Sequence, residues 1–211
     1  MTVRVMLLSP ALTDDGRQAR FGGNAPLDGA AVRRVRAAAA AVPDAARVLT
    51  GPSVRCTGTA AALGLDAVAT PELADCDWGR WEGHRLNDLA AAEPRAIAAW
   101  LSDPDAAPHG GESVAAFGAR IRGWLDGLDE PGGGTEPDGG DEPDRRGGRA
   151  GRGEARGPVL AVVEAAVVRA AVVNGLGLPA QAFWRIDVAP LTLTELTGRA
   201  GRWNLRCGQP L

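Results

Sequence analysis

A single carboxylate stands where an apolar stretch changes from strand-like to helix-like residues. The stretch VLAVVEAAVVRAAVV, residues 159–173, reads as a buried strand that runs into a helix, and Glu164 lies at the change between them. A carboxylate is costly to bury unless it is paired or hydrogen-bonded. The chemistry of Glu164 therefore depends on the groups that the rest of the chain brings to the end of this strand.

Short apolar strands alternate with helical stretches along the chain. The first strand is predicted at residues 3–9, before the segment SPAL. The other expected elements are, in chain order, a helix capped by Asp28, a strand within 46–53, a helix within 54–65 that closes at Gly64, a short strand within 67–75, a helical stretch at 86–104 interrupted near Pro94, a helix within 111–128, the strand and helix at 159–173, and a final strand or hairpin within 191–209. This alternation predicts an α/β fold, a three-layer sandwich with a largely parallel central sheet and helices on both faces. In such a sheet ligands bind beyond the carboxyl ends of the strands.

Length and composition are those of one ordinary domain, residues 1–211. A net charge of −3 gives no overall attraction to nucleic acid or to an anionic membrane. The N-terminal apolar run is too short for a signal peptide, and no apolar stretch reaches the roughly 18 to 20 residues of a membrane span. We therefore expect a cytoplasmic protein that does not bind membranes.

Three cysteines, Cys56, Cys76 and Cys207, are odd in number and far apart. They form neither a CxxC pair nor a cluster with histidine, so their spacing supports neither a zinc site nor a disulfide framework. The sequence predicts reduced thiols, no metal and no other cofactor.

Residues 129–157 differ from the rest of the chain in composition. They are rich in Gly, Pro, Asp and Arg and contain almost no apolar side chain, so they cannot bury enough surface to offset the entropy cost of ordering. The sequence predicts a disordered insertion within the domain. Its second half, RRGGRAGRG, resembles arginine-glycine segments that bind RNA, but the neighbouring acidic half offsets that charge and favours a solvated loop.

Three segments resemble, in the right order, motifs of the histidine phosphatase superfamily, the phosphoglycerate mutase-like fold. TGPSVRCTGTA places Arg55 at the phosphate-binding arginine of that family, and LADCDWGRWEG places Asp75 at its general acid. PHGGESVAAFGARI is similar to its Gly-Gly-Glu-Ser helix start, with Glu112 and Ser113 at those positions. The resemblance covers nearly the whole chain apart from residues 129–157.

The resemblance implies one histidine after the first strand and another after the late strand. In the family the first histidine takes the phosphoryl group as a phosphohistidine, while the second histidine and two arginines bind the phosphate. This sequence has Ser9 at the first arginine, Pro10 at the nucleophile and Glu164 at the second histidine. Of these four positions, only Arg55 keeps its residue type.

These replacements act against the family's reaction. The nitrogen of Pro10 is bonded into the chain and cannot attack phosphorus, and the loss of a nucleophile costs on the order of 10⁶ in rate. We therefore expect a degenerate member that lacks phosphohistidine catalysis and acts by ligand binding or regulation, with an unknown small ligand or protein as partner. The alternatives are a phosphatase that acts on small phosphomonoesters through an unconventional group, and an RNA-associated protein that uses the insertion at 129–157.

The expected pocket residues are Ser9, Arg55, Asp75 and Glu164. We expect Glu164 to form a direct or water-bridged ion pair with Arg55, with Asp75 as a further member, because a desolvated guanidinium needs a counter-ion. Three alternatives stay open: a pair between Glu164 and Arg169, reuse of the pocket for another ligand such as a cation, and a catalytic role for Glu164.

Two histidines complete the set of candidates. His109 precedes the Gly-Gly-Glu-Ser motif and is expected at the rim of the pocket, together with Glu112 and Ser113. Its imidazole replaces the missing nucleophile only if it comes within about 3.5 Å of the phosphorus atom. His84 is expected in an exposed loop. The sequence leaves the oligomeric state open.

Overall fold

Six strands form one sheet in the computed structural model, which describes residues 2–128 and 157–206. The strands are β1 (Val3–Leu8), β2 (Arg47–Thr50), β3 (Val68–Ala69), β4 (Val159–Val162), β5 (Leu193–Arg199) and β6 (Arg202–Arg206). Their order across the sheet is β3-β2-β4-β1-β5-β6, with parallel pairing from β3 to β1 and antiparallel pairing of β1 with β5 and of β5 with β6. The predicted largely parallel sheet and the final hairpin are confirmed.

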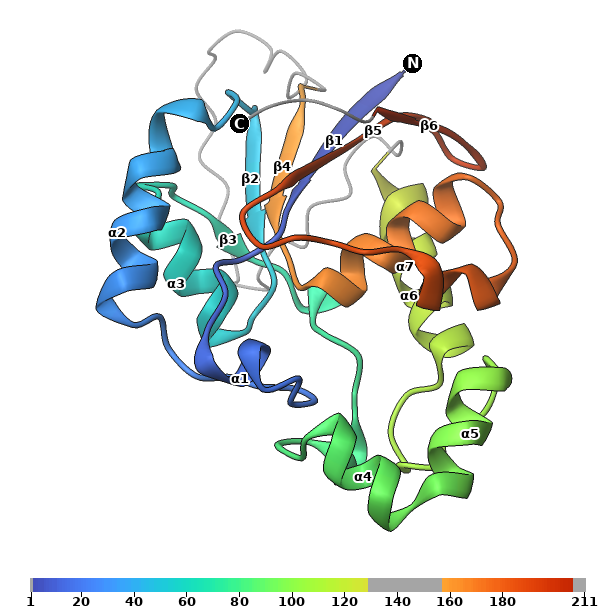
Figure 1. The fold of residues 1–211 in the computed structure, drawn as a ribbon. Helices are drawn as coiled ribbons and strands as arrows, with labels where there is room; N and C mark the ends of the chain where they lie inside the picture. Colours follow the sequence, from blue (N-terminus) through green and yellow to red (C-terminus); the bar gives the residue numbers. More distant parts are fainter. Residues whose placement is uncertain (1, 129–156, 207–211) are drawn as a thin grey trace, which may run out of the picture.

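Helices cover both faces of this sheet (Figure 1). The α-helices are α1 (Asp14–Arg17), α2 (Gly29–Ala38), α3 (Val54–Ala62), α4 (Leu86–Ala92), α5 (Pro94–Ser102), α6 (Val114–Gly127) and α7 (Ala165–Gly175), and the 3₁₀ turns are Ala39–Ala41, Pro71–Leu73, Gly79–Trp81 and Ala180–Arg185. Helices α2 and α3 lie on one side of the strands, and α6 and α7 lie on the other. The predicted three-layer α/β sandwich is confirmed. No helix within the two described ranges is long and apolar enough to cross a membrane.

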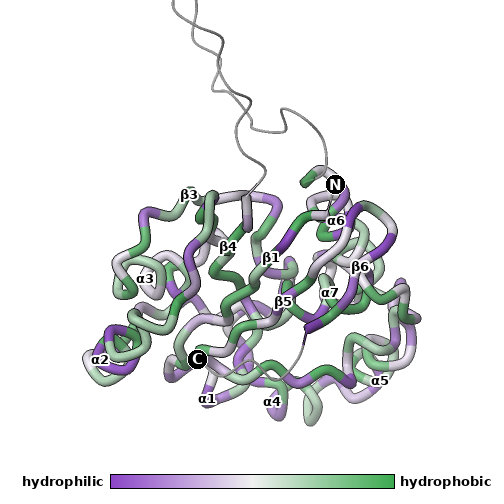
Figure 2. The backbone as a smooth tube through the Cα atoms, turned by 90° about the horizontal axis from the view of Figure 1, so that it is seen from above, coloured by the Kyte–Doolittle hydropathy of each residue, from purple (hydrophilic) through white to green (hydrophobic). Residues whose placement is uncertain are grey.

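The central strand β1 contributes to two cores. Val5 and Leu7 belong to the core that includes α6 and α7, whereas Met6 and Leu8 belong to the core that includes α2 and α3. Successive side chains of a strand point to opposite faces, so a strand between two helical layers must be apolar at nearly every position. Figure 2 shows the hydrophobic strands β1 and β4 between these layers.

Helix boundaries follow local sequence signals. Asp28 Oδ1 accepts a hydrogen bond from Ala31 N at 2.6 Å and caps α2. Beyond α3, Gly64 has a φ of +76°, a left-handed conformation that glycine adopts without steric cost. Pro94 opens α5 after α4 has ended, because its nitrogen donates no hydrogen bond to continue a helix. These three predicted boundaries are confirmed.

Two predictions concern parts of the chain outside the described residues. The expected disordered insertion, residues 129–157, lies outside them apart from Gly157, and so does Cys207. Both stay predictions. Cys56 and Cys76 lie within the described residues, as buried free thiols.

The carboxyl ends of three parallel strands meet at one edge of the sheet. Leu8 ends β1 and pairs with Val162, the end of β4, and Thr50 ends β2 and pairs with the same residue. The segments after these strands therefore start side by side. Since Arg55 and Glu164 come within a few residues of Thr50 and Val162, the topology brings both to one place.

Helix α6 packs against α7 and the turn Ala180–Arg185 through one apolar face, which includes the fully buried Phe117. Phe117→Ala should therefore lower the free energy of unfolding by about 3–5 kcal/mol, measured by urea denaturation. The matched control is Gly123→Ala on the same helix, where the position is exposed and a Cβ meets no other atom. This control should raise the free energy of unfolding by up to about 1 kcal/mol. Similar effects of the two substitutions would contradict the assigned face.

Candidate functional site

Arg55 and Glu164 form an ion pair at the carboxyl edge of the sheet. Arg55 Nε lies 3.1 Å from Glu164 Oε1, and Arg55 Nη2 contacts Glu164 Oε2. Both side chains are largely removed from water, with 17 % and 4 % of their surface exposed. The predicted direct ion pair is confirmed, in the two-bond geometry that a guanidinium and a carboxylate favour.

Ser53 connects this pair to the start of α3. Its hydroxyl accepts a hydrogen bond from Cys56 N at 3.1 Å, which caps α3, and donates one to Glu164 Oε1 at 2.7 Å. Glu164 precedes α7, but its side chain caps no backbone N–H of that helix because it is turned toward Arg55 and Ser53. Sequence reasoning misses Ser53 as a site residue, although a serine before a helix is a recognisable capping signal.

The two charges of the pair stabilise each other. Burial by itself would lower the pKa of Arg55, but the negative charge and the hydrogen bonds of Glu164 outweigh burial and raise that pKa. Burial and the same negative charge also raise the pKa of Cys56, whose Sγ lies 3.5 Å from Glu164 Oε1. Cys56 therefore stays a protonated thiol, which is a poor nucleophile.

Asp75 acts on the pair through its charge and does not touch it. Its carboxylate accepts hydrogen bonds from Cys76 N at 2.9 Å and from Trp78 Nε1 at 3.2 Å. Burial and the negative charge of Glu164 raise the pKa of Asp75 to about 6. No ion pair joins Asp75 to Arg55 in the described part of the chain. Asp75 therefore does not share the ion pair as expected, and its negative charge acts on Arg55 without contact.

Arg169 is not the partner of Glu164. Its Nε donates a hydrogen bond to Ile186 O at 2.8 Å, and the centre of its guanidinium lies 5.8 Å from the centre of the Phe183 ring. The alternative in which Glu164 pairs with Arg169 is therefore wrong. Glu164 pairs with Arg55 because Arg55 lies on α3, opposite the start of α7. Arg169 lies within α7 itself.

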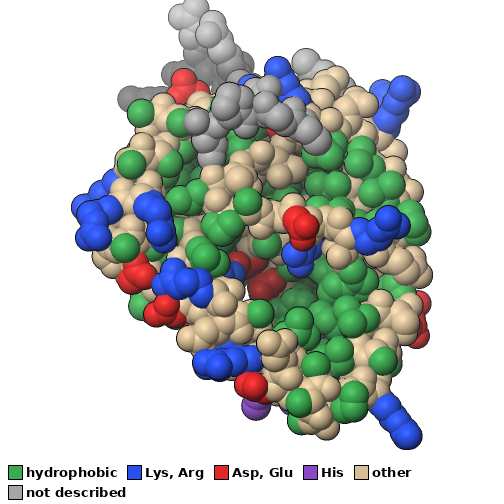
Figure 3. Space-filling model, in the orientation of Figure 1, with side chains coloured by type: hydrophobic (Ala, Val, Ile, Leu, Met, Phe, Trp, Pro, Cys, Tyr) green, Lys and Arg blue, Asp and Glu red, His purple; other side chains and the backbone are tan. Residues whose placement is uncertain are grey.

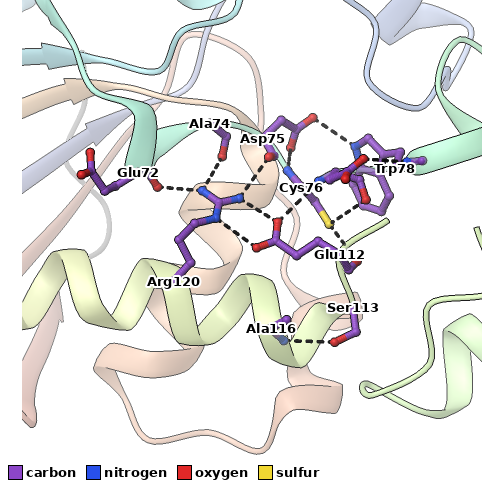
Figure 4. A network of polar contacts seen from close by, with 11 residues as sticks. Glu72, Ala74, Asp75, Cys76, Trp78, Glu112, Ser113, Ala116 and Arg120 are labelled. Atoms are coloured by element: carbon purple, nitrogen blue, oxygen red, sulfur yellow. Dashed lines mark hydrogen bonds and ion pairs between the residues drawn. The ribbon is translucent and has the colours of Figure 1, made fainter. Parts of the chain in front are cut away.

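Arg120 fixes the backbone that carries Asp75 (Figure 4). Its guanidinium donates to the backbone oxygens of Glu72, Ala74 and Asp75 at 2.7, 3.2 and 3.1 Å. It also forms a two-bond ion pair with Glu112, with Nε–Oε1 at 3.0 Å and Nη2–Oε2 at 2.8 Å. All five N–H donors of the guanidinium are thus used. Sequence reasoning misses Arg120, because no local pattern shows that this side chain bridges two loops.

The segment before α6 is held against the same loop. Glu112 N donates to Asp77 O at 2.8 Å, and a Cβ added at Gly111 would lie 2.2 Å from that oxygen. Only glycine allows so close an approach. The hydroxyl of Ser113 caps α6. Glu112 and Ser113 thus make structural contacts, and Glu112 and Asp75 both line a surface depression of about 490 Å³.

Ser9 and Pro10 come after β1 and are both buried. The Ser9 hydroxyl donates to Ala189 O at 2.5 Å and accepts from Thr192 N at 3.0 Å. It therefore joins the end of β1 to the segment before β5, and its place in the pocket stays a prediction. Pro10 has no N–H group and offers no reactive atom.

His109 lies in an aromatic cluster instead of at a pocket rim. It is 1 % exposed, and its ring centre lies 5.0 Å from that of Trp81 and 5.9 Å from that of Trp78. Its Nδ1 accepts a hydrogen bond from Gly111 N at 3.1 Å, and burial lowers its pKa. The imidazole is therefore neutral and enclosed. His84 is exposed, as predicted.

The arrangement brings charged groups together at the carboxyl edge of the sheet. Figure 3 shows a recess at the centre of the face in view, over the carboxyl ends of β1 and β4, with acidic side chains at its base. Within residues 2–128 and 157–206, no group of three His, Cys, Asp or Glu side chains is placed to hold a metal ion.

Removing either partner of the Arg55–Glu164 pair should destabilise the fold. Arg55→Ala and Glu164→Ala each leave a buried charge without its counter-ion, so each should lower the free energy of unfolding by about 3–5 kcal/mol, and the double variant should recover part of this loss. Urea denaturation of the native protein, the two single variants and the double variant gives the coupling free energy between the two side chains. The same cycle on the more exposed pair Arg80–Glu93 serves as control and should show no coupling. Additive losses at Arg55 and Glu164 would exclude a buried pair.

The raised pKa of Asp75 predicts a stability that depends on pH. Its pKa is about 6 in the folded protein and about 3.9 in an unfolded chain, so the folded state binds this proton more tightly and stability falls as the pH rises through that window. Asp75→Asn removes the titration. The stability of the native protein relative to this variant should fall between about pH 4 and pH 6 and stay constant above about pH 7. A relative stability that is flat across this window would show that the pKa is not raised.

A family model matches more than half of the chain. It is the model of the histidine phosphatase superfamily (branch 1), and the match covers residues 11–136. The matched range includes Arg55 and Asp75. It begins after Pro10 and ends before Glu164, so the two replaced positions lie outside it.

Curated mycobacterial relatives are similar over part of their length. The chain is 34 % identical over 128 residues to the bifunctional protein Rv2228c of Mycobacterium tuberculosis H37Rv and, equally, to the uncharacterized protein Mb2253c of Mycobacterium bovis. The similar region is 56 % of this chain and 35 % of each relative. The chain thus spans about a third of the length of the curated relatives it matches.

Solved structures of two phosphatases and a hydrolase share the fold. The mycobacterial glucosyl-3-phosphoglycerate phosphatase Rv2419c is 26 % identical, with 97 % of each chain covered and a TM-score of 0.73. Mycobacterial hydrolase 1 is 27 % identical, with 98 % of each chain covered and a TM-score of 0.74. The α-ribazole phosphatase of Shigella flexneri, at 20 % identity, a TM-score of 0.73 and coverage of 97 % of this chain and 95 % of its own, is similar in fold alone. With its family motifs, its sheet order and these matches, the chain belongs to the histidine phosphatase superfamily.

Proposed function

We propose that this chain is a degenerate histidine-phosphatase-fold protein that lacks phosphohistidine catalysis and acts by binding a ligand or by regulation. The observation that carries the proposal is the buried ion pair of Arg55 and Glu164. A carboxylate paired with this arginine takes the place of the phosphate charge, so the site is neutralised from within.

The electrostatics of the pair support the loss of phosphate binding. A phosphate oxygen about 4 Å from Glu164 would be repelled by roughly 4 kcal/mol per unit charge at an effective dielectric near 20. The same carboxylate occupies the Nε and Nη2 donors of Arg55. Phosphate would therefore compete with an internal anion that is already desolvated and correctly placed.

The groups around the pair also lack a substitute nucleophile. Pro10 has no N–H, and the Ser9 hydroxyl is bonded to backbone atoms of the segment before β5. Cys56 stays a thiol because burial and Glu164 raise its pKa, and His109 is enclosed by aromatic rings. No observation of these residues favours the alternative of an unconventional phosphatase. The RNA-binding alternative concerns residues 129–157, which lie outside the described residues apart from Gly157.

The purified protein should show no turnover of p-nitrophenyl phosphate and no acid-labile phosphohistidine after incubation with the ester. Pro10→His alone should not restore turnover, because Glu164 would still neutralise Arg55. The readouts are release of nitrophenol and the intact mass of the protein. Turnover that Arg55→Ala abolishes would overturn the proposal, because a contaminating phosphatase does not respond to that substitution.

A matched variant separates loss of charge balance from loss of pocket shape. Glu164→Gln keeps the size of the side chain and removes its negative charge. Inorganic phosphate should stabilise this variant against thermal unfolding and should leave the native protein unchanged, since Arg55 becomes available only in the variant. Equal stabilisation of both proteins would show that Glu164 does not exclude phosphate.

A further inference from the structure

A pocket of about 310 Å³ lies between α6, α7 and the segment that follows α7. The two helices pack against each other on one face of the sheet (Figure 1). Neither Arg55 nor Glu164 lines this pocket, so it is separate from the site at the strand ends. Its volume lies in the range of pockets that hold small organic molecules.

Small residues on α6 leave this space open. Ala115, Gly118 and Ala119 line the pocket and are three and four residues apart, so they lie on one side of the helix. A Cβ added at Gly118 would lie 3.7 Å from Asn174 Nδ2, which is an ordinary van der Waals contact. The gap between the helices therefore results from the small size of these side chains and is not closed by packing.

The inner surface of the pocket is apolar. Val173 of α7 and Phe183 of the turn after α7 line it and are 7 % and 2 % exposed. The ring of Phe183 packs edge-on against that of Phe117, with 6.2 Å between the ring centres, which fixes its position. Leu178 also lines the pocket and is 40 % exposed. A hydrocarbon group in the pocket would cover these side chains and remove apolar surface from water.

The charged side chain in the lining is the exposed Arg122, and Asn174 fixes its orientation. Arg122 Nε and Nη2 donate to Asn174 Oδ1 at 3.2 and 3.0 Å. Asn174 Nδ2 in turn donates to Gly118 O and Ala170 O at 2.7 and 2.9 Å. The outer edge of the guanidinium, formed by Nη1 and the second N–H of Nη2, donates no hydrogen bond within the described residues, and no carboxylate among them lies within ion-pair distance.

We propose that this pocket binds an apolar monocarboxylate, with its hydrocarbon part against Val173 and Phe183 and its carboxylate on Arg122. The free edge of a guanidinium presents two parallel N–H groups, which match the two oxygens of a carboxylate. A neutral molecule of the same shape would leave this edge unpaired, and a cation would be repelled by it. The inference goes beyond the proposed function, because Arg55 and Glu164 take no part in it.

The test titrates hexanoate, 1-hexanol and hexylamine into the native protein and follows the backbone NMR chemical shifts. Hexanoate should shift the resonances of α6 and α7 around Gly118 and Val173, and it should bind at least tenfold more tightly than the alcohol or the amine. From butyrate to hexanoate, each added CH₂ should tighten binding by up to about fourfold. Equal affinity for hexanoate and hexylamine, shifts confined to other elements, or no binding of hexanoate would overturn the proposal.

Variants test the space and the charge separately. Ala119→Leu places a larger side chain at the pocket and should weaken hexanoate binding at least tenfold, whereas Ala116→Leu makes the same change at an exposed position of α6 outside the lining and should leave binding unchanged. Arg122→Gln should weaken binding at least tenfold, and Arg122→Lys should retain part of the affinity. The control Arg95→Gln on α5 should have no effect. Unchanged affinity in Ala119→Leu or Arg122→Gln would refute the assignment.

A second copy of the chain is the alternative occupant of the pocket. Sedimentation velocity without added acid should give the same association state for the native protein and for Ala119→Leu, and circular dichroism checks that each variant is folded. A native dimer that Ala119→Leu dissociates would show that another copy covers α6 and α7, and it would overturn the proposal.

Discussion

The contact between Arg55 and Glu164 is the constraint on which the site depends. Parallel pairing of β2 and β4 aligns Thr50 with Val162, so the helices after these strands begin next to each other. A guanidinium at the first turn of α3 is then largely out of water and needs an anion nearby. Glu164 supplies it, and Ser53 adds a hydrogen bond to the same carboxylate. The charge balance around Arg55 thus depends on the side chain that lies between β4 and α7.

A second, independent charge pair determines where Asp75 lies. Arg120 and Glu112 use a full set of guanidinium donors to join the loop of Asp75 to the start of α6. A hydrogen bond from Glu112 N to Asp77 O adds a backbone contact at that junction. Asp75 therefore keeps its place although its carboxylate has no ion-pair partner in the described residues.

The sequence predicts the framework of the fold better than the contacts of single polar residues. Caps and breaks such as Asp28 and Pro94 are local, so their effect is visible in a few neighbouring residues. The ion pair of Arg55 and Glu164 is also predictable, because strand topology fixes where both must lie. Ser9 and His109 behave differently. The partners of Ser9 lie about 180 residues away along the chain, and the tryptophans around His109 reach it through tertiary packing, which no spacing pattern shows.

The sheet topology explains why the fold tolerates different side chains just after β1 and β4. The apolar residues of β1 and β4 pack on the helical layers and do not depend on the residue types found after Leu8 and Val162. The strand ends meet in either case, so a change of side chain at Glu164 alters the sign of the local charge without altering the sheet. The replacement is constrained by Arg55, which stays in a partly buried position on α3. A carboxylate from the protein keeps this arginine compatible with a folded core.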